Sequence, residues 1–381
     1  MTTIVKAADA AQFLSLVPAM FGFTPTRSIV IVPFAGGRSV GGMRVDIPPD
    51  DHVDAVAATL IGMVCRVEDA EAYALAVFDD EPADAELPHV GLATALRARA
   101  DACGIDTIDA LYVGPDRWGS YLDASAGGDA AALRAPGPAS AFVPLPGEDQ
   151  RSGAVLVRAP KPDRERAATA LRELERAVHV LAGGPPKGAS SRIHPTALAT
   201  AALLDDLPEF FDSVVRRAAS GVGADVGADD RARHDAYARA ALMWCLRRPA
   251  LRDIGLATWL DGAAAGDAAL EAQLRWEGGE PYSERIGRRM SGEGPQPDAE
   301  RLRAALDACR EAASVAPRGA QAGVLSACAW LSWALGRMTH AEVYARHAVG
   351  IEPGHGMGMI VLGLVGAGHL PDWAFRRPQT T

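Results

Sequence analysis

The pattern of apolar positions changes along the chain near residue 160. Up to about residue 125, short β-branched runs alternate with amphipathic stretches, whereas from 161 onward the apolar positions recur at helical spacing. The stretch 126–160 is rich in alanine, glycine and proline, a composition typical of a loop or linker. The sequence therefore predicts an α/β domain at 1–125, a linker at 126–160 and a helical domain at 161–381.

The first domain is predicted to contain a mixed sheet. Ser28–Phe34 is a continuous, largely β-branched run, which is typical of a strand buried on both faces. Gly36 and Gly37 then predict a turn into an antiparallel partner. The complete pattern gives strands at 28–34, 39–47, 72–78 and 109–113, and helices at 9–16, 50–67 and 88–102. Because strands and helices alternate, we expect an α/β fold with a mixed, partly parallel sheet flanked by helices.

The second domain is predicted to be all-helical. A helix begins at Asp163, and further helices are expected at 196–220, 229–248 and 250–260. Near the end a pattern repeats after 36 residues: Arg310, Ala312, Val315 and Pro317 recur as Arg346, Ala348, Ile351 and Pro353.

This repeat resembles the tetratricopeptide family over 299–367. Gly336, Ala341, Ala348 and Pro353 are spaced as in those helical hairpins, although Leu325 stands where a tryptophan is expected. Two alternatives stay open, tetratricopeptide-like hairpins or an ordinary helical hairpin.

Composition and charge narrow the function classes. The formal net charge of −10 disfavours general nucleic-acid binding, because an acidic surface repels phosphate. The five cysteines are far apart and form no CxxC pair, which favours free thiols over disulfides or a zinc site. The longest apolar run, 357–367, is too short to cross a bilayer, and the N-terminus has no secretory pattern. We therefore expect a cytoplasmic protein with no membrane partner.

Standard catalytic signatures are not found. The sequence contains no HExxH, no GxSxG and no phosphate-binding loop ending in Gly-Lys-Ser/Thr. The nine histidines do not cluster along the chain. We therefore expect no cofactor and no metal, and the sequence does not decide whether the protein is an enzyme.

A candidate ligand pocket is placed at the strand ends of the first domain. In open α/β sheets, ligands bind beyond the carboxyl ends of the strands. The polar and aromatic residues expected there are Arg44, Asp46, Asp79, Arg117, Trp118 and Tyr121.

Each of these groups has two interpretations. Arg44 and Asp46 either hold an anionic group or form a structural salt bridge. Asp79 either shapes a turn before Pro82 or binds a cation such as Mg²⁺. The segment from Arg117 to Tyr121 either binds a ligand or anchors a loop.

Several motifs carry a resemblance to one family. They are Val17–Pro25 leading into Ser28–Val32, Arg44–Pro48, Arg117–Tyr121 and Trp330–Gly336. With them the chain resembles the actinobacterial family named domain of unknown function 4192. In many members the segment after the Trp-x-Ser-Tyr motif looks rich in cysteine and proline. Here that segment, Leu122–Ser125, has no cysteine, so a metal or redox role at that place is not implied for this chain.

Two functional hypotheses follow. The first is a non-catalytic interaction or regulatory protein, with a protein or peptide bound through the helical part or a small ligand bound by the α/β domain. This first hypothesis is based on the 36-residue repeat and on the absence of catalytic signatures from the sequence. The alternative is a hydrolase or transferase acting on an anionic small substrate at the strand ends.

Overall fold

The structure is a computed structural model that describes residues 7, 9–82, 86–133, 149–184, 193–220 and 228–376. The chain divides into two compact units. The α/β unit comprises residues 1–153 and 375–381, and the helical unit comprises residues 154–374. The two units are described separately below.

The α/β unit is built on a mixed sheet, as the sequence predicts, and its described residues form seven strands where the sequence predicts four. The strands are β1 (Ser28–Ala35), β2 (Arg38–Ser39), β3 (Met43–Asp46), β4 (Ala72–Phe78), β5 (Asp106–Val113), β6 (Arg117–Ser120) and β7 (Gly127–Asp129). Their order is β2-β1-β4-β5-β6-β7, and β3 also pairs with β1. The pair β4–β5 is parallel, while β1 runs antiparallel to β2, β3 and β4. The apolar runs of β1 and β4 fill the centre of the sheet, because both faces of these strands are covered.

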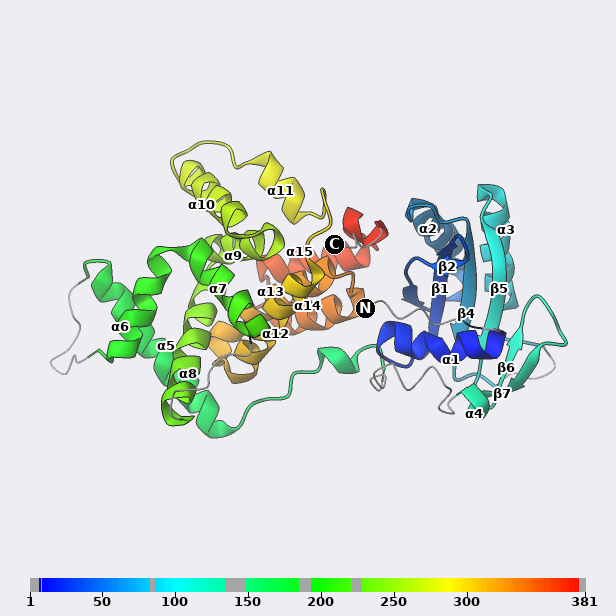
Figure 1. The fold of residues 1–381 in the computed structure, drawn as a ribbon, viewed down its shortest axis with the longest axis horizontal. Coiled ribbons are helices and arrows are strands. Elements are labelled where there is room, and N and C mark those ends of the chain that lie inside the picture. The colour runs from blue at the N-terminus through cyan, green and yellow to red at the C-terminus, as the bar shows by residue number, and fades with distance from the viewer. Residues whose placement is uncertain are drawn as a thin grey trace. The chain divides into compact units, whose positions relative to one another are not determined.

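Helices cover both faces of this sheet (Figure 1). Helices α2 (Val53–Arg66) and α3 (Val90–Cys103) pack on one face, and α1 (Ala10–Phe21) packs on the other. Alternate residues of β1 supply the two cores: Ile29 and Ile31 face α2 and α3, whereas Val30 and Val32 face α1. The period-two alternation therefore decides which helix each strand residue meets.

The N-terminal helix differs from its predicted bounds. The sequence places its end before Pro18, but α1 continues to Phe21 and ends at Gly22, which has a left-handed φ of 76°. A proline removes one helical hydrogen bond, and the burial of Leu14 and Val17 against the sheet keeps the helix intact around it. The predicted start is correct, since Asp9 caps the helix by accepting a hydrogen bond from the Gln12 amide at 2.8 Å.

The region predicted as a linker begins with regular structure. Strand β7 and helix α4 (Ala130–Leu133) lie within 126–160, and β6 comes just before it. The glycines of β7 have a packing role, because a Cβ atom on Gly128 would lie 2.9 Å from Nε1 of Trp118. A glycine-rich composition, which is typical of linkers, here reflects the space that a neighbouring indole takes up.

The described parts of the helical unit contain helices as their regular elements. These are α5 (Lys161–Leu181), α6 (Pro195–Ala202), α7 (Leu207–Ser220), α8 (Ala228–Leu246), α9 (Pro249–Asp261), α10 (Ala263–Glu277), α11 (Glu284–Met290), α12 (Ala299–Val315), α13 (Arg318–Ala334), α14 (Met338–Ile351) and α15 (Gly356–Gly366). Helices α10 and α11 are not among the helices that the sequence predicts. Among the described helices of the chain, none combines the length and the apolar character that crossing a bilayer requires.

The repeated pattern near the end coincides with consecutive helix pairs. Ala312 in α12 and Ala348 in α14 occupy matching places in the repeat, and both are fully buried. Helix α13 packs against α12, α14 and α15, and small side chains along its length permit close approach. The helical hairpins are thus present, and their membership of the tetratricopeptide family stays a prediction.

A second close approach joins α13 to α8. A Cβ atom on Gly323 would lie 2.6 Å from the Cα of Arg247 and 2.7 Å from the carbonyl oxygen of Leu246. Backbone atoms cannot move aside independently, so only a residue without a side chain fits at this crossing.

Gly323→Ala is expected to lower the free energy of unfolding of the helical unit by about 2 kcal/mol through overpacking. Urea denaturation followed by tryptophan fluorescence measures this effect, since six of the seven tryptophans lie in that unit. Gly319→Ala in the same helix is the control, because its Cβ would meet open space. Equal stability of the two variants would show that the crossing is not tight.

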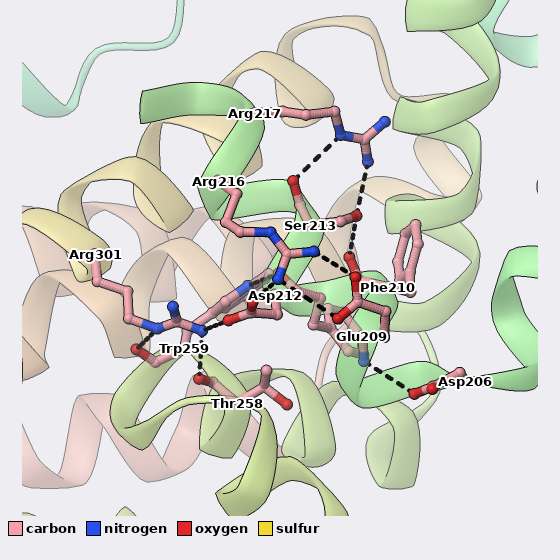
Figure 2. A network of polar contacts seen from close by, with 11 residues as sticks. Asp206, Glu209, Phe210, Asp212, Ser213, Arg216, Arg217, Thr258, Trp259 and Arg301 are labelled. Carbon is pink, nitrogen blue, oxygen red and sulfur yellow. Dashed lines mark hydrogen bonds and ion pairs between the residues drawn. The ribbon is translucent and has the colours of Figure 1, made fainter. Parts of the chain in front are cut away.

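A network of ion pairs around Asp212 joins three helices of this unit (Figure 2). The Asp212 side chain is 13% exposed and accepts hydrogen bonds from Arg216 of α7 and from Arg301 of α12. Arg301 also donates to the carbonyl oxygens of Thr258 at 3.0 Å and Trp259 at 3.2 Å, near the end of α9. One buried carboxylate therefore holds the guanidinium group that ties α12 to α9.

Asp212→Asn is expected to cost about 2 kcal/mol of unfolding free energy, because it leaves the largely buried Arg301 without its carboxylate. Glu209→Gln is the matched control. Glu209 pairs with Arg216 but is 56% exposed, so its loss should change stability by less than about 0.5 kcal/mol. Thermal unfolding of both variants compares them, and a Glu209 effect as large as that of Asp212 would contradict the assignment.

Candidate functional site

The sheet topology brings several predicted site residues to one end of the sheet. Asp46 at the end of β3 and Phe78 at the end of β4 both pair with Ser28, the first residue of β1. Phe78 also pairs with Val113, the last residue of β5, which in turn pairs with Trp118 of β6. The carboxyl ends of β3, β4 and β5 therefore meet, as the strand-end hypothesis requires.

The two faces of the sheet separate these residues. Met43 and Val45 pack on the face of α2 and α3, so the alternating residues Arg44 and Asp46 are directed to the opposite face. Trp118 also belongs to the core on the α1 side. Asp79 and Tyr121 lie instead on the α2 and α3 side, and the sheet stands between the two groups.

Arg44 and Asp46 form an ion pair within the sheet. The Arg44 side chain is 7% exposed, bonds to Asp46 and donates from Nε to the Ser28 hydroxyl at 2.7 Å. Burial lowers the pKa of Arg44, and the neighbouring Asp46 carboxylate opposes that shift. These contacts are typical of a structural salt bridge, one of the two interpretations of the pair.

The segment from Arg117 to Tyr121 makes anchoring contacts. Trp118 is 9% exposed and packs over Gly128, while Arg117 is exposed. The Tyr121 hydroxyl donates to the carbonyl oxygen of Pro88 at 2.7 Å, and burial raises the pKa of this phenol. Tyr121 thus fixes the loop that leads into α3.

Asp79 is the predicted residue with the most distinctive surroundings. Its Oδ2 lies 2.7 Å from Nε2 of His89, and its Oδ1 accepts a hydrogen bond from the Asp80 amide at 2.8 Å. The Asp79 and His89 side chains are only 12% and 17% exposed. His89 comes directly before α3 with a φ of 60°, a left-handed conformation unusual for histidine. A carboxylate that bonds one ring nitrogen orients the imidazole and leaves the other nitrogen for a second partner.

Glu81 completes a set of three side chains that could hold a metal ion. One ligand atom from each of Asp79, Glu81 and His89 lies within 4.8 Å of the others. We call this set the strand-end triad. Sequence reasoning considered Asp79 but missed His89, which is ten residues away and becomes a neighbour only through the start of α3. Where the sequence analysis expects no metal, the structure places three ligand atoms together.

Tyr112 of β5 contacts the backbone of one member of the triad. Its hydroxyl donates to the backbone carbonyl of Glu81. Burial, followed by the charges of Asp79, Glu81 and Asp80, raises the pKa of Tyr112 to about 12. The phenol therefore stays protonated and keeps donating this hydrogen bond at neutral pH.

A pocket of about 370 Å³ opens beside His89. Its polar lining comes from His89 and from Asp50, Asp51 and Asp54 before and within α2, and apolar side chains such as Leu92 complete it. Among the described residues that line it there is no lysine or arginine. The electrostatic potential of such a pocket attracts cations and repels free anions.

A larger pocket, of about 860 Å³, lies in the helical unit between α7, α8 and α12. Arginines and carboxylates both line it, including Arg216 and Arg301 of the Asp212 network and the pair Arg239–Glu311 at 3.3 Å. Some of these arginines and carboxylates pair with each other, and the pocket presents both signs of charge to a ligand. We call it the three-helix groove.

Comparison with known proteins gives one family match. The model described as Domain of unknown function (DUF4192) matches residues 11–284, which span the α/β unit and the helical unit through α10 to the first residue of α11. The hairpins from α12 to α15, with the Trp330–Gly336 motif, lie beyond the matched residues. No curated protein and no solved structure matches the chain. Because the match covers more than half of the sequence, the chain belongs to the family described as Domain of unknown function (DUF4192).

Proposed function

We propose that this protein is a binding protein of regulatory type, whose α/β unit takes up a divalent metal ion at the strand-end triad. The observation that carries the proposal is the convergence of Asp79, Glu81 and His89 within 4.8 Å at the carboxyl ends of β4 and β5. Ligand sites of open α/β sheets lie in this position.

The chemistry of the donors selects the kind of cation. Two carboxylates and one imidazole suit Mn²⁺, Fe²⁺ or Zn²⁺, since Mg²⁺ and Ca²⁺ favour oxygen ligands alone. Three protein ligands leave coordination positions open on the metal. The neighbouring pocket shares His89 with the triad, so a small molecule bound there would lie next to the metal ligands.

The helical unit supplies a place for a protein partner. The three-helix groove presents arginines and carboxylates side by side, which suits a peptide carrying charges of both signs. Its volume of about 860 Å³ is also within the range of small-ligand sites. The proposed partner binding thus depends on this groove, and the proposed metal binding depends on the α/β unit.

A second candidate function is a hydrolase or transferase at the same triad, and the Asp79–His89 contact favours it. A histidine ligand oriented by a carboxylate is typical of hydrolytic metal sites, where the metal activates a bound water. The acidic lining disfavours a free anionic substrate, so an anionic group would have to be recruited by the metal. Because the candidate enzyme would depend on the metal to recruit its substrate, activity measured without metal would argue against it.

Titration of the full chain with Mn²⁺ or Zn²⁺ by calorimetry tests the binding proposal. We expect one site per chain, with affinity lowered at least about 10-fold by His89→Ala and by Asp79→Asn, because each removes a ligand. Asp46→Asn is the control, since Asp46 is directed to the other face of the sheet and is 66% exposed. Unchanged affinity in both triad variants, or no binding by the wild-type chain, would refute the site.

Assays with ester and phosphate model substrates separate the two candidates. For a binding protein we expect tight metal binding with no turnover above the rate of the free metal ion. For an enzyme, turnover should require metal and fall by about 100-fold or more in His89→Ala, because the change removes a ligand of the catalytic metal. Turnover that survives both metal removal and His89→Ala would exclude the triad as its source.

A further inference from the structure

Two cysteines of the α/β unit lie at the ends of neighbouring helices. Cys65 is in the last turn of α2, and Cys103 is the final residue of α3. Each helix connects two strands of like direction, α2 from β3 to β4 and α3 from β4 to β5. Both helices therefore run from the carboxyl ends of the strands to the amino ends, and their C-terminal ends lie together.

The side chains of this pair meet at the protein surface. Helices α2 and α3 pack against each other, and both contribute to the same hydrophobic core. Cys65 and Cys103 are both exposed, and their side chains are neighbours. The pair is thus open to a reagent from solution.

We propose that Cys65 and Cys103 form a disulfide-bonding pair, oxidised by a low-molecular-weight disulfide. One cysteine thiolate attacks the reagent, forms a mixed disulfide and releases one equivalent of small thiol. The second cysteine thiolate then attacks the protein sulfur of that mixed disulfide and releases the other equivalent. Two protein thiols are oxidised, one small disulfide is reduced, and the two protons stay with the released thiols or pass to solvent.

The surroundings of the thiols set the speed of this reaction. Burial, followed by the neighbouring thiol of Cys103, raises the pKa of Cys65. The thiolate is the nucleophile, so oxidation is slow at neutral pH and accelerates as the pH rises. The bond would close the segment between α2 and α3 that contains β4, and would restrict the unfolded chain.

A second cysteine pair in the same chain serves as a control, because its thiols are neighbours but are not accessible to solvent. Cys309 of α12 and Cys328 of α13 are a second pair of neighbouring thiols, but both are fully buried. A reagent that needs contact with sulfur reaches Cys65 and Cys103 and leaves this second pair reduced. The proposal is independent of metal binding, because Cys65 and Cys103 lie at the end of the sheet away from the strand-end triad.

The test is oxidation of the folded, full-length protein by oxidised glutathione at mildly alkaline pH. We expect intact mass spectrometry to show the loss of two hydrogens with no retained glutathione, and peptide mapping to find a Cys65–Cys103 link that dithiothreitol reverses. Cys65→Ser and Cys103→Ser should each retain one glutathione on the remaining cysteine, because the second attack is impossible. Wild-type protein that carries glutathione on both cysteines, or links Cys309 to Cys328 instead, would overturn the proposal.

Discussion

Parallel pairing between β4 and β5 is the constraint on which the chemistry of the α/β unit depends. A parallel pair requires a crossover, and α3 supplies it between Phe78 and Asp106. The crossover has to start at the carboxyl end of β4, so it places His89 beside Asp79 at its own beginning. It has to finish at the amino end of β5, so it places Cys103 beside Cys65 at its own end. The parallel pairing of β4 and β5 thus places a set of possible metal ligands at one end of the sheet and a pair of thiols at the other.

The helical unit depends on a different kind of constraint, the exclusion of side-chain volume. Gly323 lets α13 touch the backbone of α8, and small residues along α13 let it pass through the centre of the unit. Close backbone approach leaves little room for polar groups, and a buried charge of this unit, Asp212, is satisfied by Arg216 and Arg301. A buried charge in such packing is stable only with its partners in place, so the network fixes the relative positions of α7, α9 and α12.

The sequence predicted the parts of the fold in which one physical signal dominates. Strands β1 and β4 were placed within one residue, because their continuous apolar runs reflect burial on both faces. Strands β6 and β7 were missed because their glycines fit against distant neighbours, Gly119 against Leu87 and Gly128 against the ring of Trp118, contacts that no local pattern reveals. The candidate site was also predicted only in part. Asp79 was found from its place after a strand, whereas His89 was missed, since its partner is set by the crossover and not by spacing.

The places of the charged side chains in the structure add to what the net charge indicates about possible ligands. The net charge of −10 argued against nucleic acid as a partner of the whole chain, but it did not say where the negative charge collects. In the structure, Asp50, Asp51 and Asp54 line the pocket beside His89, and Asp79 and Glu81 belong to the triad. The arginines expected to attract an anion do not line this pocket: Arg44 is directed to the opposite face and bonded to Asp46. The described lining of this pocket therefore repels a free anion, because its charged side chains are carboxylates.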